Sequence, residues 1–226
     1  MKKVGIIVAM GKELELLLPL LENKRQTTVQ GTVFYSGTAG SNEVCAMQCG
    51  IGKVNAAIGT LLLIQHFSPD YIINTGVAGG GGNHVQVMDI VAGAQVAYHD
   101  VWCGPESEWG QVQGLPLYYE GAADLLQRLP QRPDVKTGLI CSGDRFIDNK
   151  PDIESIQRHF PAVLAVDMES GAIAQVCRLR GVPFLSLRVI SDSPGASHDN
   201  TRQYLDFWAD APRHSFEIVK SLISNL

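Results

Sequence analysis

The sequence predicts a single α/β domain over residues 1–226, with a central mixed and twisted sheet flanked by helices. Apolar runs of strand length alternate with segments of helical periodicity, which is typical of a mainly parallel sheet with helices on its faces. A chain of 226 residues that is 45% hydrophobic and 18% charged can bury one large core. No repeat, low-complexity tract or linker divides the sequence, so one domain is expected.

In the first half of the chain, short apolar runs predict strands around two helices. "VGIIVA" is a buried strand, and the amphipathic segment "KELELLLPLLEN" is a helix that Pro19 bends or ends. "TVFYSGTA" and "EVCAMQCG" predict two antiparallel strands. The expected elements are a strand at 4–9, a helix at 12–23, strands at 32–39 and 43–50, a helix at 53–67, and strands at 70–76 and 89–98.

The second half begins with a long surface loop at 102–117, which is rich in Gly and Pro. Strands and helices then alternate, and Gly181 marks the C-terminal end of one helix. The expected elements are a strand at 136–144, a helix at 153–160, a strand at 162–167, a helix at 170–181, a strand at 182–192 and a closing helix at 201–226.

Charge and cysteine content limit the possible partners and the compartment. The net charge is −5 and Lys and Arg form no run, so neither duplex nucleic acid nor an anionic membrane is an expected partner. The five cysteines are an odd number without a C-x-x-C pair, which indicates a reducing, cytoplasmic setting. The apolar start is too short for a signal peptide, and no apolar run approaches ~20 residues, the length of a membrane span.

Candidate site residues follow directly after the predicted strands, where open α/β sheets bind their ligands. The segment "AVDMES" poses a choice, because acidic residues in a first helical turn also complement the helix dipole. Three carboxylates, an aromatic residue and two Met nevertheless share this predicted edge. The candidates are Met10, Glu13, Ile51, Asp144, Phe146, Ile147, Met168, Glu169, Arg188, Ser191 and Asp192, together with the glycine turn around Val77.

These segments resemble the 5′-methylthioadenosine/S-adenosylhomocysteine nucleosidases of the nucleoside phosphorylase superfamily. The matching pieces are "GIIVAMGKELE", "GIGKVNAA", "INTGVAGG", "VMDIV", "YHD", "CSGDRFI", "AVDMES" and "RVISD". They occur in the family's order from the N-terminus to Asp192, so the resemblance covers most of the chain. It implies a nucleoside phosphorylase-like fold and hydrolysis of the N-glycosidic bond of 5′-substituted adenine nucleosides.

The resemblance also implies a role for each polar candidate. Asp192 is expected to protonate adenine at N7, and Glu169 to bind the ribose hydroxyls and favour the developing cation. Glu13 is expected to orient and activate water, with Arg188 near it. An aspartate is ionised at neutral pH in water, so the acid role requires surroundings that keep Asp192 protonated.

The apolar candidates are expected to form the walls of the pocket. Phe146 stacks on adenine and the Ile147 backbone hydrogen-bonds it, while Met10, Ile51 and Met168 pack on the sugar and its 5′ substituent. Ser191 completes the predicted substrate-binding set with Val77. Many family members have Ser at the position of Val77, and the loss of that hydroxyl weakens a water or anion site.

Metal and dinucleotide sites are not expected. The six histidines show no ligand spacing such as H-E-x-x-H, and "GVAGGGG" lacks the G-x-G-x-x-G form that opens a helix. No cofactor is therefore predicted. His99 and Asp100 are read as a loop-packing pair rather than a catalytic dyad, and Asp89 as a turn carboxylate that accepts from backbone donors.

Two other functions stay open: a phosphorylase that uses phosphate in place of water, and a non-catalytic nucleoside-binding protein. Lys12, Glu13 and Val77 in the first two glycine loops disfavour phosphate, because a carboxylate repels it. The resemblance implies a homodimer whose partner helps to close the 5′ side. The preferred 5′ substituent stays open. The aromatic residue that covers the 5′ substituent also stays open, with Trp102, Tyr204 and Phe207 as candidates. The reason is that this sequence differs from the family's motif after the Ser197-His198 pair.

Overall fold

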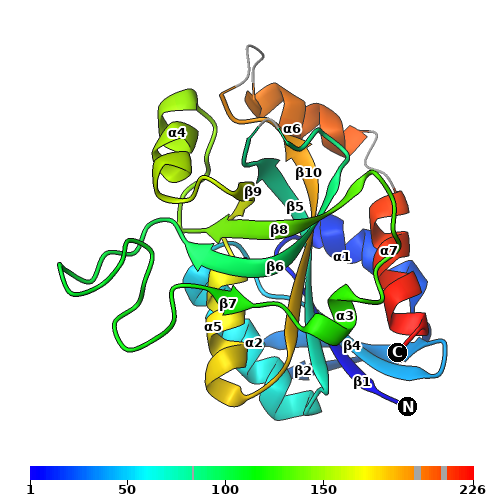
Figure 1. The fold of residues 1–226 in the computed structure, drawn as a ribbon. Helices are drawn as coiled ribbons and strands as arrows, with labels where there is room; N and C mark the ends of the chain where they lie inside the picture. The colour runs from blue at the N-terminus through cyan, green and yellow to red at the C-terminus, as the bar shows by residue number, and fades with distance from the viewer. Residues whose placement is uncertain (83, 196–199, 210–212) are drawn as a thin grey trace.

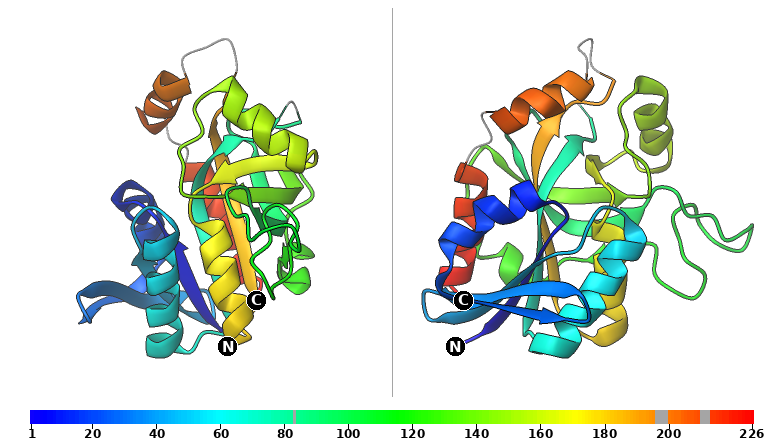
Figure 2. Two further views of the ribbon diagram at one scale, coloured as in Figure 1. Left: turned by 90° about the vertical axis from the view of Figure 1, so that its left-hand side faces the viewer. Right: turned by 180° about the vertical axis from the view of Figure 1, so that it is seen from behind.

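A mixed sheet runs through the protein, and helices cover both of its faces (Figures 1 and 2). The computed structural model describes residues 1–82, 84–195, 200–209 and 213–226. The strands are β1 (Lys3–Val8), β2 (Glu22–Val29), β3 (Thr32–Ala39), β4 (Asn42–Gln48), β5 (Tyr71–Gly80), β6 (Ile90–Tyr98), β7 (Tyr119–Glu120), β8 (Val135–Ser142), β9 (Val163–Asp167) and β10 (Phe184–Asp192).

The helices lie between these strands and at the C-terminus. A single 3-10 turn, Leu18–Leu20, follows the first of them. The α-helices are α1 (Gly11–Leu17), α2 (Lys53–Phe67), α3 (Ala123–Leu126), α4 (Lys150–His159), α5 (Ser170–Arg180), α6 (Asn200–Ala209) and α7 (Arg213–Ser224).

Part of the sheet closes on itself. The strands follow the order β10–β6–β8–β9–β5–β1–β4–β3–β2, β7 pairs with β6, and β10 also pairs with β5. Strands β5, β10, β6, β8 and β9 therefore form a closed ring. Both parallel pairs, such as β5–β10, and antiparallel pairs, such as β5–β9, occur, which confirms the predicted mixed sheet.

Alternation along β1 shows how the sequence divides the core between the two faces. Val4, Ile6 and Val8 pack in one cluster with residues of α1 and α7. Ile7 packs in the other cluster, with residues of α2 and α5. This period of two is the expected pattern of a strand, and the absence of polar positions in it reflects helices on both faces. In the described part of the chain, no helix is long and apolar enough to span a bilayer.

The prediction was wrong between Glu22 and Val29. It extended the first helix to Asn23 and placed no strand after it, whereas α1 ends at Leu17, Pro19 lies in the 3-10 turn and β2 follows. β2 is an edge strand with almost all of its side chains exposed, so its sequence carries no apolar alternation. Only its β-branched Thr and Val residues indicate a strand.

The single closing helix predicted at 201–226 is also wrong. The structure places two helices there, α6 and α7, and residues 210–212 between them lie outside the described part of the chain. Ser197 and His198 also lie outside it. The short elements β7 and α3 were missed, because two and four residues are too few to show a period.

Candidate active site

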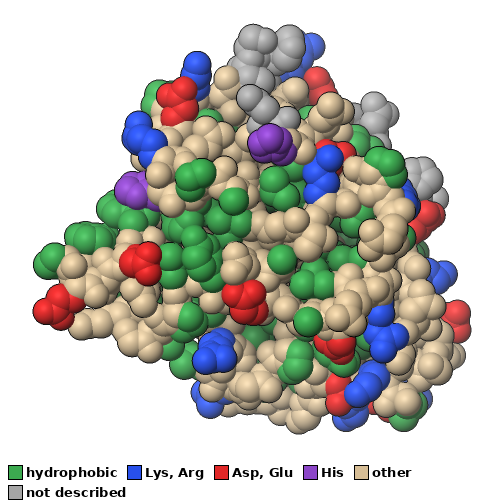
Figure 3. Space-filling view, in the orientation of Figure 1, with side chains coloured by type: hydrophobic (Ala, Val, Ile, Leu, Met, Phe, Trp, Pro, Cys, Tyr) green, Lys and Arg blue, Asp and Glu red, His purple; other side chains and the backbone are tan. Residues whose placement is uncertain are grey.

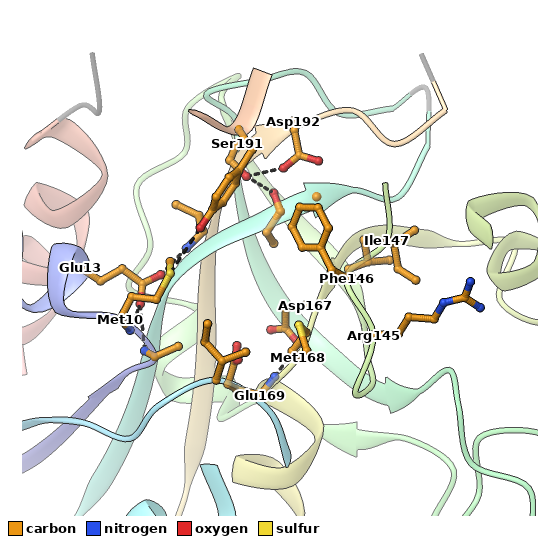
Figure 4. Close-up of a pocket in the computed structure, with 17 residues that line it drawn as sticks. Met10, Glu13, Arg145, Phe146, Ile147, Asp167, Met168, Glu169, Ser191 and Asp192 are labelled. Atoms are coloured by element: carbon orange, nitrogen blue, oxygen red, sulfur yellow. Dashed lines mark hydrogen bonds between the residues drawn. The ribbon is translucent and has the colours of Figure 1, made fainter. Parts of the chain in front are cut away.

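Most of the predicted site residues meet in one pocket at the carboxyl ends of the strands, whereas Asp144 and Arg188 are not among the described residues that line it (Figure 4). The cavity has a volume of about 90 Å³ and opens to solvent. In Figure 4, Glu13 and Met10 lie on one side, Ser191 and Asp192 at the top, and Glu169 below. The predicted residues that line it are Met10, Glu13, Ile51, Val77, Phe146, Ile147, Met168, Glu169, Ser191 and Asp192.

Glu13 is held in place by backbone donors. It lies in the first turn of α1 and is buried, with 1% of its surface exposed. Its Oε2 accepts from the backbone N–H of Ala9 and of Met10, both at 2.9 Å, and its Oε1 accepts from that of Val77 at 3.0 Å. Burial raises the pKa of Glu13, while the charge of Arg188 and these three hydrogen bonds act in the opposite direction.

Glycine at position 76 makes this approach of Glu13 to β5 possible. A Cβ added at Gly76 would lie 2.3 Å from Glu13 Oε1 and 2.8 Å from Arg188 Nη1. No side chain fits there. The same distances place the Arg188 guanidinium next to the Glu13 carboxylate, as the family resemblance implied.

Arg188 lies beneath the pocket rather than in its lining. Its side chain is fully buried and, among the described residues, it is not one of those that line the cavity. Arg188 Nε lies 2.7 Å from Asp167 Oδ2, and Nη2 lies 3.6 Å from Glu169 Oε2. Nη2 also donates to Asn74 Oδ1 at 2.5 Å. A buried guanidinium requires such partners, and here they fix its position.

Sequence reasoning missed the neutral members of this buried network. Ser170 Oγ binds Asp167 and lies 2.7 Å from Ser186 Oγ, and Ser186 Oγ lies 3.3 Å from Asn74 Oδ1. The signal was present as alternation: Ser186 and Arg188 in β10 pair in register with Asn74 and Gly76 in β5. Polar residues at every second position of apolar strands therefore share one side of the sheet.

Glu169 points away from the helix that it precedes. It is the N-cap residue of α5 but its side chain makes no capping bond; Asp167 Oδ1 instead accepts from the N–H groups of Glu169 and Ser170. Glu169 Oε1 accepts from the Gly52 N–H at 3.0 Å. Burial raises the pKa of Glu169 to about 7, with Arg188 lowering it and Asp167 raising it further.

Asp192 and Ser191 share a chain of hydrogen bonds at the end of β10. Ser191 Oγ lies 2.5 Å from Asp192 Oδ1 and 3.2 Å from the carbonyl oxygen of Ala78. A hydroxyl has one proton, and the Ala78 carbonyl is only an acceptor. The Ser191 hydroxyl therefore donates either to Asp192 or to Ala78, and not fully to both. Asp192 is buried, with 2% of its surface exposed.

Tyr204 closes one side of the pocket. It is the only one of the three aromatics considered from the sequence that lines the cavity within the described residues; Trp102 and Phe207 do not. The Tyr204 ring lies edge-on to Phe146 with centroids 5.7 Å apart, and its hydroxyl donates to Met10 Sδ at 3.3 Å. The Tyr204 side chain of α6 therefore connects the Phe146 and Met10 walls of the cavity.

The remaining predictions on single residues have clear outcomes. Asp89 is confirmed as a turn carboxylate, since its Oδ2 accepts from the Gln86 N–H at 2.8 Å. Asp100 binds Lys53 through both carboxylate oxygens, at 2.9 and 3.0 Å. Arg145 also lines the pocket, but Figure 4 shows its side chain pointing away from the cavity, and it pairs with Asp152.

Comparison with known proteins agrees with this fold and pocket. Residues 3–224 match the family model described as the phosphorylase superfamily. A 5′-methylthioadenosine/S-adenosylhomocysteine nucleosidase from Chromohalobacter salexigens is 39% identical over 234 residues, covering 100% of this chain and 98% of its own. The nucleosidase of the same name from Neisseria meningitidis, solved with methylthio-immucillin-A, has a TM-score of 0.93 at 35% identity, with 100% of both chains covered. A futalosine hydrolase mutant from Helicobacter pylori has a TM-score of 0.89 at 27% identity, also with 100% of both chains covered.

Fold, pocket and family match together define a member of the phosphorylase superfamily, and the enzyme is a hydrolytic purine nucleosidase. Within that superfamily the chain belongs to the 5′-methylthioadenosine/S-adenosylhomocysteine nucleosidases, whose sequences and structures it matches over its full length.

Proposed function

We propose that the enzyme hydrolyses the N-glycosidic bond of 5′-substituted adenine nucleosides, including methylthioadenosine and S-adenosylhomocysteine, and releases adenine and the 5′-substituted ribose. The observation that carries this proposal is the placement of Glu13, Glu169 and Asp192 on separate sides of one pocket that Phe146 also lines. Acid, cation stabiliser and water-activating base can then act on one bond from different directions.

Asp192 supplies the proton in this mechanism. It donates to N7 of adenine as the C1′–N9 bond breaks, and the bonding electrons leave with the neutral base. This role requires that Asp192 is protonated before the reaction. After the proton transfer, the Ser191 hydroxyl, which lies 2.5 Å from Asp192 Oδ1, can donate to the new carboxylate.

Glu169 and Glu13 act on the other side of the bond. Glu169 hydrogen-bonds the ribose hydroxyls and stabilises the positive charge on the ring. Both Glu13 oxygens already accept backbone N–H groups, but a carboxylate has about four acceptor sites, so one remains for water. Burial raises the pKa of Glu13, which makes it a better base for the water that attacks C1′.

Hydrolysis rather than phosphorolysis follows from the same contacts. Glu13 accepts the Val77 N–H, a donor that would otherwise be available to an anion, and its buried carboxylate repels phosphate. Adenine release should therefore need neither phosphate nor metal. The test is an assay with and without phosphate, after dialysis against a chelator. A ribose 1-phosphate product, or activity lost and restored by a metal ion, would reject hydrolysis by side chains alone.

The preferred 5′ substituent is tested by comparing kcat/KM for methylthioadenosine, S-adenosylhomocysteine, 5′-deoxyadenosine and an aminofutalosine-like nucleoside. Tyr204, Met10 and Ile51 line the side of the pocket assigned to this group. They present mainly apolar surface, so the thioether of methylthioadenosine should be preferred over a polar substituent. A preference for the futalosine-like nucleoside would place the enzyme closer to the hydrolases of that substrate.

The pH dependence should report the protonation of Glu169. Because its pKa is raised to about 7, Glu169 loses its charge as the pH falls below that value. kcat/KM for adenine release should then fall about tenfold per pH unit on the acid side. In Glu169→Gln this part of the profile should flatten. If the fall in kcat/KM on the acid side persists unchanged in Glu169→Gln, it must be assigned to another group, such as Glu13.

We infer that the enzyme works as a homodimer. α2 carries Val54, 68% exposed, and Ile58, 55% exposed, one turn apart, and Ile51, 52% exposed, precedes them next to the pocket. Trp102 is also exposed, in the loop that reaches away from the body of the protein between β6 and β7 (Figure 1). Such an apolar surface beside a site is typical of a protein interface.

Sedimentation at micromolar concentration tests this inference. Ile58→Glu should shift the mass towards that of a monomer. Leu205→Glu, a change of the same kind at a similarly exposed position on α6, should not. A wild-type protein that stays monomeric at these concentrations would contradict the proposal.

The expected cellular setting is the cytoplasm, and the partners are small molecules. All five cysteines are free, which suits a reducing compartment. Lys and Arg side chains lie scattered among acidic ones on the face shown in Figure 3, rather than in one basic patch of the kind that binds nucleic acid.

A further inference from the structure

Three residues outside the pocket join the loops that form it. Lys53 is the first residue of α2, Asp100 follows β6 and Asp144 follows β8. Lys53 Nζ donates to both carboxylate oxygens of Asp100, at 2.9 and 3.0 Å. The Lys53 backbone N–H donates to Asp144 Oδ1 at 2.7 Å, and the Asp144 N–H donates to Asp100 Oδ2 at 2.8 Å. The three contacts close a ring, called the clamp below.

The clamp is attached at both ends to groups that face the substrate. The N–H of Gly52, directly before Lys53, donates to Glu169 Oε1 at 3.0 Å. Phe146 and Ile147 of the pocket wall follow Asp144 by two and three residues. Two neighbouring N–H groups at the N-terminus of α2 therefore bind two carboxylates. The Gly52 N–H binds Glu169, on the ribose side of the pocket. The Lys53 N–H binds Asp144, which precedes the adenine side.

Gly52 is suited to this double attachment. Its φ of 92° is in the region that favours glycine, and an added Cβ would lie 3.0 Å from Asp144 Oδ1. The Lys53–Asp100 pair is partly shielded, with side chains 25% and 26% exposed, and Lys53 Nζ lies over the Tyr98 ring at 5.3 Å from its centroid. Partial burial makes such a pair stiffer and less screened than an open surface pair.

We propose that Lys53, Asp100 and Asp144 are positioning residues that set the spacing between the adenine-binding loop and Glu169. None of the three is among the described residues that line the pocket, so the clamp acts through Gly52 and through residues 144–147. Its loss should displace the ribose side relative to the adenine side. Displacements of about 1 Å can cost a factor of up to about 10² in rate. The inference rests on the proposed function, since it assigns the clamp to the same reaction.

Asp100→Asn tests the clamp, because the amide keeps the shape but presents an N–H group to the Lys53 ammonium. We expect kcat for adenine release to fall about tenfold or more. KM should change by much less. The control is Asp134→Asn, which removes an exposed pair with Arg132 away from the pocket and should leave kcat unchanged. If Tm falls by a similar amount in Asp100→Asn and Asp134→Asn but kcat falls only in Asp100→Asn, the effect on kcat comes from positioning and not from lost stability.

A second pair of variants keeps the test decisive if Asp100→Asn does not fold. Lys53→Met removes the ammonium but keeps the backbone bond to Asp144, whereas Lys53→Arg keeps the charge. Lys53→Arg should retain more kcat than Lys53→Met. Equal kcat values for these two variants, or an Asp100→Asn enzyme within about twofold of the wild type, would overturn the proposal.

A double-mutant cycle of Asp100→Asn with Glu169→Gln shows whether the clamp acts through Glu169. Because the clamp positions that carboxylate, the combined loss of kcat should be smaller than the product of the single losses. A strictly multiplicative result would overturn the coupling. Failure of the proposed function is recognised separately, since the wild-type enzyme would then release no adenine from any of the nucleosides.

Discussion

Asp192→Asn should fold normally and lose a factor of about 10² to 10⁴ in kcat, or about 3 to 5 kcal/mol of transition-state stabilisation. The asparagine amide can donate a hydrogen bond to adenine N7 but cannot transfer a proton, so the base must leave as an anion. The change is isosteric, and the carboxamide can still meet Ser191 Oγ, which lies 2.5 Å from Asp192 Oδ1 in the wild type. The measurement is adenine release, followed by absorbance, beside the Tm of each protein.

Asp206→Asn is a suitable control, because Asp206 is an exposed aspartate on α6, paired with Arg202 and absent from the pocket lining. It should keep wild-type turnover. Near wild-type adenine release from a folded Asp192→Asn enzyme would remove Asp192 from the role of acid. A nucleoside with a better leaving group should recover part of the lost rate, because it needs less protonation.

The pocket could be located from the sequence because α/β sheets bind ligands at the carboxyl ends of their parallel strands, and this sheet contains such strands. Met10 and Ile51 follow the parallel strands β1 and β4, and Asp192 ends β10, which is parallel to β5. Each residue was found by its place after an apolar run, and the fold then brought them together. The glycine turn predicted around Val77 is wrong, since β5 continues through Val77 to Gly80.

Arg188 shows that the position of a residue along a strand does not reveal which partners its side chain contacts. It lies inside β10, so its side chain points to one face or the other, and the sequence alone does not say what that face contains. Its partners Asp167, Asn74 and Ser170 come from three other segments, and only the fold reveals that they meet. β2 was missed for the opposite reason, since a strand without a buried face leaves no apolar pattern.

Glu169→Gln should slow turnover by about 100-fold or more while leaving the fold intact. A carboxylate beside the ribose hydroxyls strengthens its hydrogen bonds as the ring gains positive charge, so it stabilises the transition state more than the ground state and acts on kcat. The amide keeps the acceptor for the Gly52 N–H but loses the charge. Arg188 retains Asp167 at 2.7 Å, so the buried guanidinium still has an anionic partner.

The alternative explanation of this residue, that it serves the helix dipole, predicts a different outcome. The N–H groups of Glu169 and Ser170 are bound by Asp167, and the Glu169 side chain makes no capping bond. A residue that only favoured the dipole would contribute about 0.3 to 1 kcal/mol of stability and nothing to turnover. The structure assigns that helix-capping task to Asp167.

The stability of the variant adds a second measurement with a fixed sign. The folded-state pKa of Glu169 is raised from 4.5 to about 7, chiefly by burial. Its contribution to stability is therefore fully present below pH 4.5 and is lost as the pH rises through 7. Glutamine stays neutral and escapes this loss, so Glu169→Gln should be at least as stable as the wild type at pH 8. Under the dipole explanation it would be less stable there.

Kinetics on two sugars complete the test. kcat/KM should be compared for a ribonucleoside and its 2′-deoxy analogue. The gap between the two kcat/KM values should be smaller in Glu169→Gln than in the wild type, because the variant has lost the carboxylate charge that interacts with the 2′-hydroxyl. Glu154→Gln is the matched control, since Glu154 is exposed on α4 and pairs there with Lys150. A destabilised Glu169→Gln enzyme with intact kcat and an unchanged gap would reject Glu169 as the ribose-binding carboxylate.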